Sequence, residues 1–329
     1  MILAGDIGGT HTRLAFFEES NVQSQPCFLE VISSQAHSGL TPMLHEFIER
    51  HRIRVKSACF GVAGPVQNQR CAGSNLPWIV DSQQLVRDLG IQSILIVNDL
   101  EANAYGIALL KPSDFTVLNV GSPMACGNRA LISAGTGLGE AGLLEEKPKC
   151  QPFPSEGGHV NFGPRDDLEI ELLRYLLPRF GHVSYERVLS GPGLHNIYEF
   201  LRDSGRGAEP QWLTSELEHG DPAGVICKNG LEQNCEICIQ ALNIFASIYG
   251  SEAGNLALKV MATGGVYVGG GIAPRILKKL QEPEFMRSFL AKGRMSHLLQ
   301  DIPVRVIKNE MTALLGAGYL AGEAAMASG

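Results

Sequence analysis

The sequence lacks the features that mark secreted, membrane-spanning and nucleic-acid-binding proteins. Its 329 residues contain no run of 18 apolar residues, so we expect no membrane span and no membrane partner. Segment 1–6 has neither a basic stretch nor a long apolar stretch, so we expect no signal peptide. Lysine and arginine form no continuous stripe and the formal net charge is -7, so a nucleic-acid partner is not indicated.

The eight cysteines are scattered along a chain far larger than a disulfide-stapled domain. Cys235 and Cys238 have the Cys-x-x-Cys spacing, but no second pair or nearby histidine completes four zinc ligands. We interpret these two as small apolar residues of a helix, with a redox role as the alternative. Scattered thiols without a signal peptide predict a reducing, cytoplasmic location.

Length and pattern predict two α/β domains. With 44% hydrophobic and 19% charged residues the composition is globular, and 329 residues exceed one ordinary core. The apolar patterns run from β-rich to helical and back to β-rich. We expect a small domain of residues 1–110, joined by a C-terminal helix at 311–326, and a large domain of residues 111–310, facing each other across a cleft.

Local patterns predict the individual elements. Short apolar runs predict strands at 2–6, 13–17, 26–32, 58–63, 93–97, 115–120, 129–133, 139–145, 264–268 and 304–307. Helical apolar spacing predicts helices at 41–50, 82–89, 100–109, 168–177, 192–202, 231–260 and 311–325. We expect Asp81 or Ser82 to cap the helix at 82–89.

A glycine-rich turn between the first two predicted strands is the first candidate ligand site. It reads Gly5-Asp6-Ile7-Gly8-Gly9-Thr10. Phosphate oxygens need several close N–H donors, which Gly8, Gly9 and Thr10 can supply without bulky side chains blocking the approach. Asp6 repels phosphate but suits the Mg²⁺ that bridges phosphates. The alternative is a tight hairpin with a capping aspartate.

Two later glycine turns are further candidates. Gly135-Thr136-Gly137 follows a predicted strand and can bind phosphate, although it is neither a Gly-x-Gly-x-x-Gly motif nor a P-loop. Gly269-Gly270-Gly271 can lie against a flat adenine ring, where side chains would clash. A glycine-rich hairpin and close helix–strand packing are the respective alternatives.

Asn98 and Asp99 lie where a strongly apolar strand ends and a helix begins. In open α/β sheets, ligands gather at the carboxyl ends of strands. A carboxylate there can accept the proton of an alcohol whose oxygen attacks phosphorus. The alternative is that Asp99 only caps the helix.

The segment Glu156-Gly157-Gly158-His159 brings a carboxylate and an imidazole together across two glycines. Both groups suit sugar hydroxyls. A zinc site is the rival, disfavoured because no Glu or His at helical spacing completes a ligand set. Glu186 is a candidate third sugar group, with a solvated residue paired to Arg187 as the alternative.

In order, these motifs resemble the bacterial glucokinase family, and the resemblance covers nearly the whole chain. The matching segments are Gly-Asp-Ile-Gly-Gly-Thr at 5–10, Val-Asn-Asp-Leu at 97–100, Gly-Thr-Gly-Leu-Gly at 135–139, Glu-Gly-Gly-His-Val-Asn-Phe at 156–162, Glu-Arg-Val-Leu-Ser-Gly-Pro-Gly-Leu at 186–194, Gly-Gly-Gly-Ile-Ala-Pro-Arg at 269–275 and Asp-Ile-Pro-Val at 301–304. The resemblance implies a two-domain actin-like ATPase (ribonuclease H-like) fold, homodimers, and phosphorylation of glucose at its 6-hydroxyl by ATP, a reaction of glycolysis.

The resemblance also implies roles for residues. Asp99 would be the general base, and Asn98, Glu156, His159 and Glu186 would hold the other hydroxyls of glucose. The groups near the ATP phosphates would be Gly5, Asp6, Ile7, Gly8, Gly9, Thr10, Gly135, Thr136 and Gly137, with Gly270 and Gly271 near adenosine. Mg²⁺ would arrive with ATP and be positioned by Asp6, without a separate protein metal site.

Two positions depart from the family pattern. His11 stands where Asn is more usual, and Ser74-Asn75-Leu76-Pro77-Trp78 matches the sugar-side loop loosely, which makes Asn75 a weaker sugar contact. The cysteine-rich zinc motif of the repressor-and-kinase branch is absent, and no helix-turn-helix precedes Gly5, so we do not expect a DNA-binding regulator.

Alternatives to a glucose-specific enzyme stay open at this point. A broader hexose kinase and a catalytically weak, sugar-binding regulatory protein share the scaffold. A Rossmann dehydrogenase would need a Gly-x-Gly-x-x-Gly motif with a distal acidic residue, which we do not find. The phosphoryl donor is expected to be ATP, with ADP and polyphosphate as alternatives.

Overall fold

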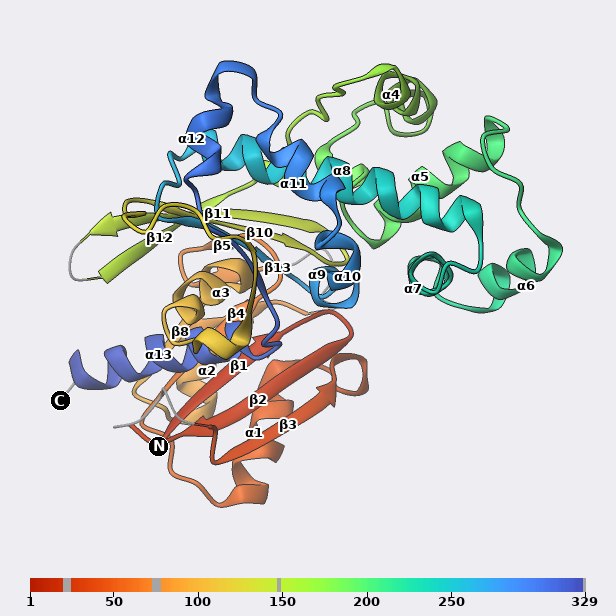
Figure 1. The fold of residues 1–329 in the computed structure, drawn as a ribbon. Coiled ribbons are helices and arrows are strands. Elements are labelled where there is room, and N and C mark those ends of the chain that lie inside the picture. Colours follow the sequence, from red (N-terminus) through yellow and green to blue (C-terminus); the bar gives the residue numbers. More distant parts are fainter. Residues whose placement is uncertain (20–24, 73–77, 147–148, 328–329) are drawn as a thin grey trace. The chain divides into compact units, whose positions relative to one another are not determined.

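The computed structural model describes residues 1–19, 25–72, 78–146 and 149–327. The chain forms two compact units, Met1–Pro112 together with Asn309–Gly329, and Ser113–Lys308 (Figure 1). Each unit has its own main sheet and its own hydrophobic core.

The first unit is built on a five-stranded sheet in the order β3-β2-β1-β4-β8. Its strands are β1 (Ile2–Ile7), β2 (His11–Phe17), β3 (Phe28–Ser33), β4 (Ser57–Val62) and β8 (Ser93–Asn98). Strands β1, β4 and β8 run parallel, with Ile7 opposite Val62 and Val62 opposite Asn98. The carboxyl ends of these strands therefore meet at one edge, and the turn after β1 lies at the same edge as Asn98.

Helices cover both faces of this sheet because side chains alternate along each strand. The helices are α1 (Leu40–His51), α2 (Ser82–Leu89), α3 (Asp99–Ile107) and α13 (Thr312–Ala327). Leu3 and Ile7 share one core with α1 and α2, whereas Ile2 and Ala4 share another with α3 and α13. Asp81 caps α2 by accepting a hydrogen bond from Gln84 N–H at 3.1 Å, which confirms one of the two predicted caps.

Three two-residue strands form a further small sheet that sequence patterns did not predict. They are β5 (Val66–Gln67), β6 (Arg70–Cys71) and β7 (Val80–Asp81), in the order β5-β6-β7. Strands this short carry no readable apolar alternation.

The second unit is built on a six-stranded sheet in the order β12-β11-β10-β13-β14-β9. Its strands are β9 (Phe115–Asn119), β10 (Arg129–Ala134), β11 (Leu138–Glu146), β12 (Lys149–Ser155), β13 (Gly265–Gly269) and β14 (Val304–Ile307). Strands β10 and β13 run parallel and end side by side, Ser133 opposite Gly269. Both glycine turns of this unit therefore follow neighbouring strands at one edge of the sheet.

The helices of the second unit supply most of its core. They are α4 (Asp167–Phe180), α5 (Gly191–Asp203), α6 (Gln211–His219), α7 (Pro222–Leu231), α8 (Glu236–Lys259), α9 (Ile272–Arg275), α10 (Leu277–Leu280), α11 (Pro283–Leu290) and α12 (Ser296–Gln300). Short 3₁₀ turns include η3 (Gly157–His159) and η4 (Tyr185–Arg187). Helix α8 is the core helix, with Phe245 and Tyr249 both fully buried.

The predicted single helix at 231–260 is wrong at its start. Helix α7 ends at Leu231 and α8 begins at Glu236. Between them Gln233 has φ of 57°, a left-handed backbone that no helix continues through. Cys235 is the N-cap of α8 and Cys238 lies inside it, both buried, as expected for small apolar residues.

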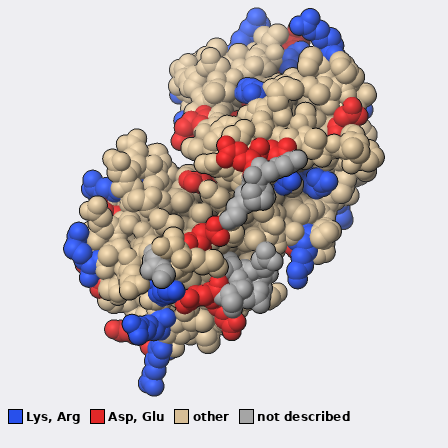
Figure 2. All heavy atoms as spheres, turned by 90° about the vertical axis from the view of Figure 1, so that its left-hand side faces the viewer, with Lys and Arg blue, Asp and Glu red and all other residues tan. Residues whose placement is uncertain are grey.

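The surface shows two further properties. None of the helices in the described part of the chain combines the length and apolarity needed to cross a membrane. Lysine and arginine side chains are dispersed over the face shown in Figure 2 and form no continuous basic patch on it.

Candidate active site

The opening turn divides into a buried part and a surface part. Gly5 and Ile7 are buried in β1, and a Cβ on Gly5 would lie 2.6 Å from Phe60 Cδ1, so Gly5 permits close packing. The residues of the turn that reach the surface are Asp6, Gly8, Gly9 and Thr10. These four are the ones available to a ligand.

Hydrogen bonds fix the backbone of this turn. Gly8 N–H donates to the His11 carbonyl at 3.1 Å. The buried Ser34 hydroxyl donates to the Gly8 carbonyl at 2.6 Å and is hydrogen-bonded to the Thr12 hydroxyl at 2.9 Å. A turn held in this way presents its remaining backbone donors without reorganising.

Asp6 and Asp99 of the first unit are two carboxyl groups whose charges interact. Arg13 Nη1 donates to Asp6 Oδ2 at 3.2 Å, and Arg13 Nη2 lies 3.5 Å from Glu310. Burial nevertheless raises the pKa of Asp6, with Arg13 acting in the opposite direction. Burial, followed by the charge of Asp6, raises the pKa of Asp99 from 3.8 to about 6.

The helix after β8 holds Asp99 in place. Asn98, not Asp99, is the N-cap of α3: its Oδ1 accepts a hydrogen bond from Leu100 N–H at 2.9 Å, and its Nδ2 donates to the Gly64 carbonyl at 3.0 Å. Asp99 is the first residue of the helix and its Oδ1 also accepts from Leu100 N–H at 2.9 Å. The capping role that rivalled catalysis for Asp99 is therefore filled by its neighbour.

In the second unit, the two glycine turns are joined through one buried tyrosine. The Tyr249 hydroxyl of α8 accepts from Ala134 N–H and donates to the Gly269 carbonyl, both at 3.2 Å. These atoms end β10 and β13, immediately before the turns. Gly270 has φ of 81°, and a Cβ there would lie 2.3 Å from the Ala134 carbonyl oxygen, so only glycine fits.

The glycine turns leave open space where a side chain would stand. A Cβ on Gly135 or Gly271 would meet no atom within 4 Å, and Thr136 is exposed. The Gly135 carbonyl accepts a hydrogen bond from Gly191 N–H at 2.8 Å, which attaches this turn to the start of α5. A ligand can therefore approach the backbone closely on a fixed support.

The predicted sugar residues of this unit lie on neighbouring turns. Glu156 is the N-cap of η3 and His159 is its last residue; both side chains are exposed, with 3.9 Å between His159 Nε2 and Glu156 Oε2. Tyr185 N–H donates to the Val160 carbonyl at 3.1 Å, which places η4 beside η3. Glu186 on η4 accepts from Leu138 N–H at 3.1 Å, instead of pairing with Arg187.

Glu186 also lies against the second glycine turn. A Cβ on Gly137 would fall 2.5 Å from Glu186 Oε2. The structure thus brings together Glu156, His159, Glu186 and Gly137 within the second unit, and Asp6, Asn98 and Asp99 within the first. Asn75 lies outside the described residues.

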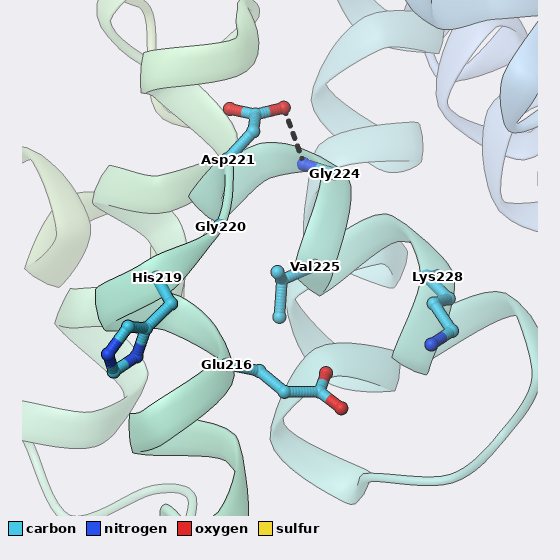
Figure 3. Close-up of a pocket in the computed structure, with 7 residues that line it drawn as sticks. All are labelled: Glu216, His219, Gly220, Asp221, Gly224, Val225 and Lys228. Atoms are coloured by element: carbon cyan, nitrogen blue, oxygen red, sulfur yellow. Dashed lines mark hydrogen bonds between the residues drawn. The ribbon is translucent and has the colours of Figure 1, made fainter.

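Sequence patterns missed several supporting residues. Arg13 was predicted only as part of the strand at 13–17 and Tyr249 only as part of the helix at 231–260, because nothing local in the sequence identifies their partners in the folded chain. A shallow pocket of about 410 Å³ between α6 and α7 was also not predicted; its lining residues are Glu216, His219, Gly220, Asp221, Gly224, Val225 and Lys228 (Figure 3). Asp221 is occupied there as the N-cap of α7, 3.0 Å from Gly224 N–H.

Comparison with known proteins identifies the family of this chain. The glucokinase family model matches residues 3–324. This chain belongs to the glucokinase family. A curated glucokinase from Nostoc punctiforme is 40% identical over 336 residues, covering 98% of both chains.

Solved glucokinase structures resemble the fold. The crystal structure of a glucokinase from an Antarctic psychrotroph has a TM-score of 0.82 at 28% identity, covering 98% of both chains. A ROK-family glucokinase from Streptomyces griseus, in complex with glucose and AMPPNP, has a TM-score of 0.67 at 18% identity, covering 98% of this chain and 99% of that one. These neighbours confirm the predicted α/β, actin-like ATPase fold.

Proposed function

We propose that this glucokinase-family protein transfers the γ-phosphoryl group of ATP to the 6-hydroxyl of D-glucose, with Asp99 as the general base. The observation that carries the proposal is Asp99 at the carboxyl end of β8, close enough to Asp6 for the two charges to interact, with a pKa of about 6. A base of this pKa is ionised at pH 7 and still accepts a proton effectively.

The proposed chemistry is a single displacement. As the 6-oxygen of glucose forms its bond to the γ-phosphorus, its proton passes to the Asp99 carboxylate, and the bond between the γ-phosphorus and the bridging oxygen of ADP breaks. The products are glucose 6-phosphate and ADP, and Asp99 later returns the proton to solvent.

The residues present fit a nucleotide and its metal. In the second unit, the open space at Gly135 and Gly271 allows a nucleotide to approach the backbone closely. In the first unit, the His11 carbonyl already accepts the Gly8 N–H, contrary to the donor role expected for Gly8, so we assign phosphate binding to the backbone of Gly9 and Thr10. Asp6, with a fifth of its side chain exposed, offers a hard carboxylate oxygen to Mg²⁺. Bound there, Mg²⁺ would neutralise phosphate charge.

The proposed sugar-binding groups of the second unit are two carboxylates and an imidazole. Glu156 and His159 can accept and donate to sugar hydroxyls, and Glu186 is held by Leu138 N–H in a position to accept as well. The glucokinase structure from Streptomyces griseus is a complex with glucose and AMPPNP, which supports the same pair of substrates here.

A panel of sugars and donors tests the proposal. Purified protein is given glucose, mannose, glucosamine or fructose with ATP, ADP or polyphosphate, and sugar phosphate is measured. We expect glucose with ATP to give the highest kcat/KM. Equal rates on several hexoses would instead indicate a broad hexose kinase, and no product with any pair would indicate a sugar-binding protein.

We further propose a homodimer working in the cytoplasm at the entry of glucose into glycolysis. All eight cysteines are free thiols, which suits a reducing compartment. Light scattering of the purified protein should give twice the chain mass of 35.5 kDa. A monomer at micromolar concentration would contradict the assembly but leave the activity unaffected.

A further inference from the structure

Two carboxyl groups lie in the interior of the second unit, and the proposed reaction uses neither of them. Glu140 of β11 is 1% exposed and Glu252 of α8 is 0% exposed. Acidic side chains are seldom fully buried unless a partner or a proton neutralises them.

Within the described residues, only Glu252 of the pair forms an ion pair with a cation at hydrogen-bond distance. Lys259 Nζ lies 2.9 Å from Glu252 Oε1, and Asn255 Nδ2 donates to Glu252 Oε2 at 2.7 Å. In contrast, Glu140 Oε1 is buried and has no hydrogen-bond partner in the described part of the chain. Glu252 is the neighbour whose charge and hydrogen-bonding raise the pKa of Glu140 after burial, and since a carboxylate can only accept, such a hydrogen bond requires a proton on one of the two.

The pair lies directly against the turns that carry the proposed sugar groups. A Cβ on Gly157, next to Glu156, would fall 2.0 Å from Glu140 Oε2, so this carboxyl occupies the space beside η3. Asn255 Nδ2, which donates to Glu252, also donates to the Tyr185 hydroxyl at 3.0 Å. Tyr185 precedes Glu186, so Glu140 lies against η3 directly and Glu252 is linked to η4 through Asn255.

Strand β11 ties the two turns together at the same place. Leu138, two residues before Glu140, donates its N–H to Glu186 at 3.1 Å. The Leu138 carbonyl oxygen would lie 2.0 Å from a Cβ on Gly158. Any shift of β11 at Glu140 therefore moves the supports of Glu186 and of η3 together.

Several other titratable groups face the pair. Lys259 and Tyr249 of α8 interact with Glu140, and Tyr185 of η4 and Lys292 after α11 interact with Glu252. Glu169 of α4 and its partner Arg165 lie one step further out and act on Lys292. Burial and then the charge of Glu252 raise the pKa of Glu140 to about 8, with Lys259 acting in the opposite direction. Burial lowers the pKa of Lys292 to about 8, so this group titrates in the same range.

We propose that Glu140 is a positioning residue for the sugar turns: a proton shared between Glu140 and Glu252 holds β11 against η3 and η4, and its release to solvent at alkaline pH loosens both turns and weakens glucose binding. The proposal rests on the assignment of Glu156, His159 and Glu186 to the sugar. It concerns KM for glucose rather than the proton transfer at Asp99.

The first test follows KM for glucose from pH 7 to pH 9.5 in wild type, Glu140→Gln and the control Glu145→Gln, an exposed acid on the same strand. Glutamine reproduces the shape of the protonated acid and cannot release the proton. We expect the wild-type and Glu145→Gln KM to rise by up to about tenfold per pH unit above pH 8, and the Glu140→Gln KM to stay flat. If the KM of Glu140→Gln also rises with pH, the titrating group is Lys292 or another residue, and the proposal is overturned. A wild-type KM that does not change with pH overturns it as well, and that measurement does not depend on the folding of a variant.

The second test measures the pH dependence of stability, without any substrate. The folded chain keeps a proton on Glu140 up to about pH 8, whereas the unfolded chain releases it near the ordinary value of 4.5. The unfolding equilibrium constant of wild type relative to Glu140→Gln should therefore rise by up to about tenfold per pH unit between about pH 5 and 8 and then level off. A ratio independent of pH overturns the shared proton. Absence of glucose phosphorylation by wild type at pH 7.5 would refute the proposed function instead and leave this second test valid.

Discussion

Replacing Asp99 by asparagine removes the proposed proton acceptor while leaving its surroundings in place. The amide oxygen can still accept from Leu100 N–H, and Asn98 continues to cap α3. A positioned general base contributes about 10² to 10⁴ in rate, or about 3 to 5 kcal/mol of barrier. We therefore expect kcat to fall by that factor and KM for glucose to change by less than about threefold.

The pKa of Asp99 gives the same prediction a pH signature. With a pKa of about 6, roughly nine-tenths of the wild-type Asp99 is ionised at pH 7 and roughly one-tenth at pH 5. Wild-type kcat/KM should therefore fall about tenfold per pH unit below 6. An aspartate at the ordinary 3.8 would give a flat profile from pH 7 to pH 5.

The stability of the Asp99→Asn variant shows whether a loss of activity comes from lost chemistry or from unfolding. Because the folded pKa of Asp99 is raised, its contribution to stability is present below about pH 4 and lost as the pH rises through 6. At pH 7 the Asp99→Asn variant should be as stable as wild type or more stable, by up to about 3 kcal/mol.

Initial rates of glucose 6-phosphate formation, measured from pH 5 to pH 8, test the three expectations together with urea unfolding. Asp88→Asn, an exposed acid on α2, is the matched control and should keep wild-type kcat. An Asp99→Asn variant that retains more than a tenth of wild-type turnover, or a wild-type profile flat down to pH 5, would refute the general-base assignment.

Three further predictions follow from single contacts. Glu186→Gln keeps an acceptor for Leu138 N–H but loses its charge, so KM for glucose should rise about tenfold with little change in stability; an unchanged KM removes Glu186 from the sugar site. Gly157→Ala places a Cβ 2.0 Å from Glu140 Oε2, so glucose affinity and the melting temperature should both fall, and a wild-type affinity would contradict the packing of η3 on β11. Asp81→Ala deletes the cap of α2 and should lower the free energy of unfolding by about 1 kcal/mol in urea titration while kcat is unchanged; a loss of kcat would mean that α2 acts on catalysis.

Sequence patterns predicted what is encoded locally. The strand at 93–97 and the helix that follows put Asn98 and Asp99 at a strand end, and the structure has β8 ending at Asn98. Glycine permits unusual backbone angles and aspartate caps helices, so either residue at the end of a predicted strand or helix can be interpreted from its neighbours in sequence. The strand from Val304 to Ile307 was likewise predicted to the residue.

Features that depend on partners distant in sequence were not predicted. The interaction of Asp6 with Asp99 arises from the parallel register of β1, β4 and β8. Glu140 lies in a segment that was predicted as a strand, but its burial beside Glu252 depends on α8, more than a hundred residues later. No local periodicity contains that information.

Some local signals were misleading. Strand β12 contains Pro152 and Pro154, which disfavour a strand, yet it lies at the edge of its sheet, where proline is tolerated. The run from 231 to 260 has continuous helical spacing, but Gln233 adopts a left-handed backbone and divides it. Tertiary packing overrides the pattern in both places.

The most direct test of glucose phosphorylation is the identity and amount of the product. Purified protein, ATP, Mg²⁺ and glucose are followed by ³¹P NMR, with glucose omitted in a parallel sample. We expect glucose 6-phosphate and ADP to form in equal amounts, and no ADP without glucose. Phosphate on another hydroxyl, or ADP release that does not depend on glucose, would contradict the proposed reaction.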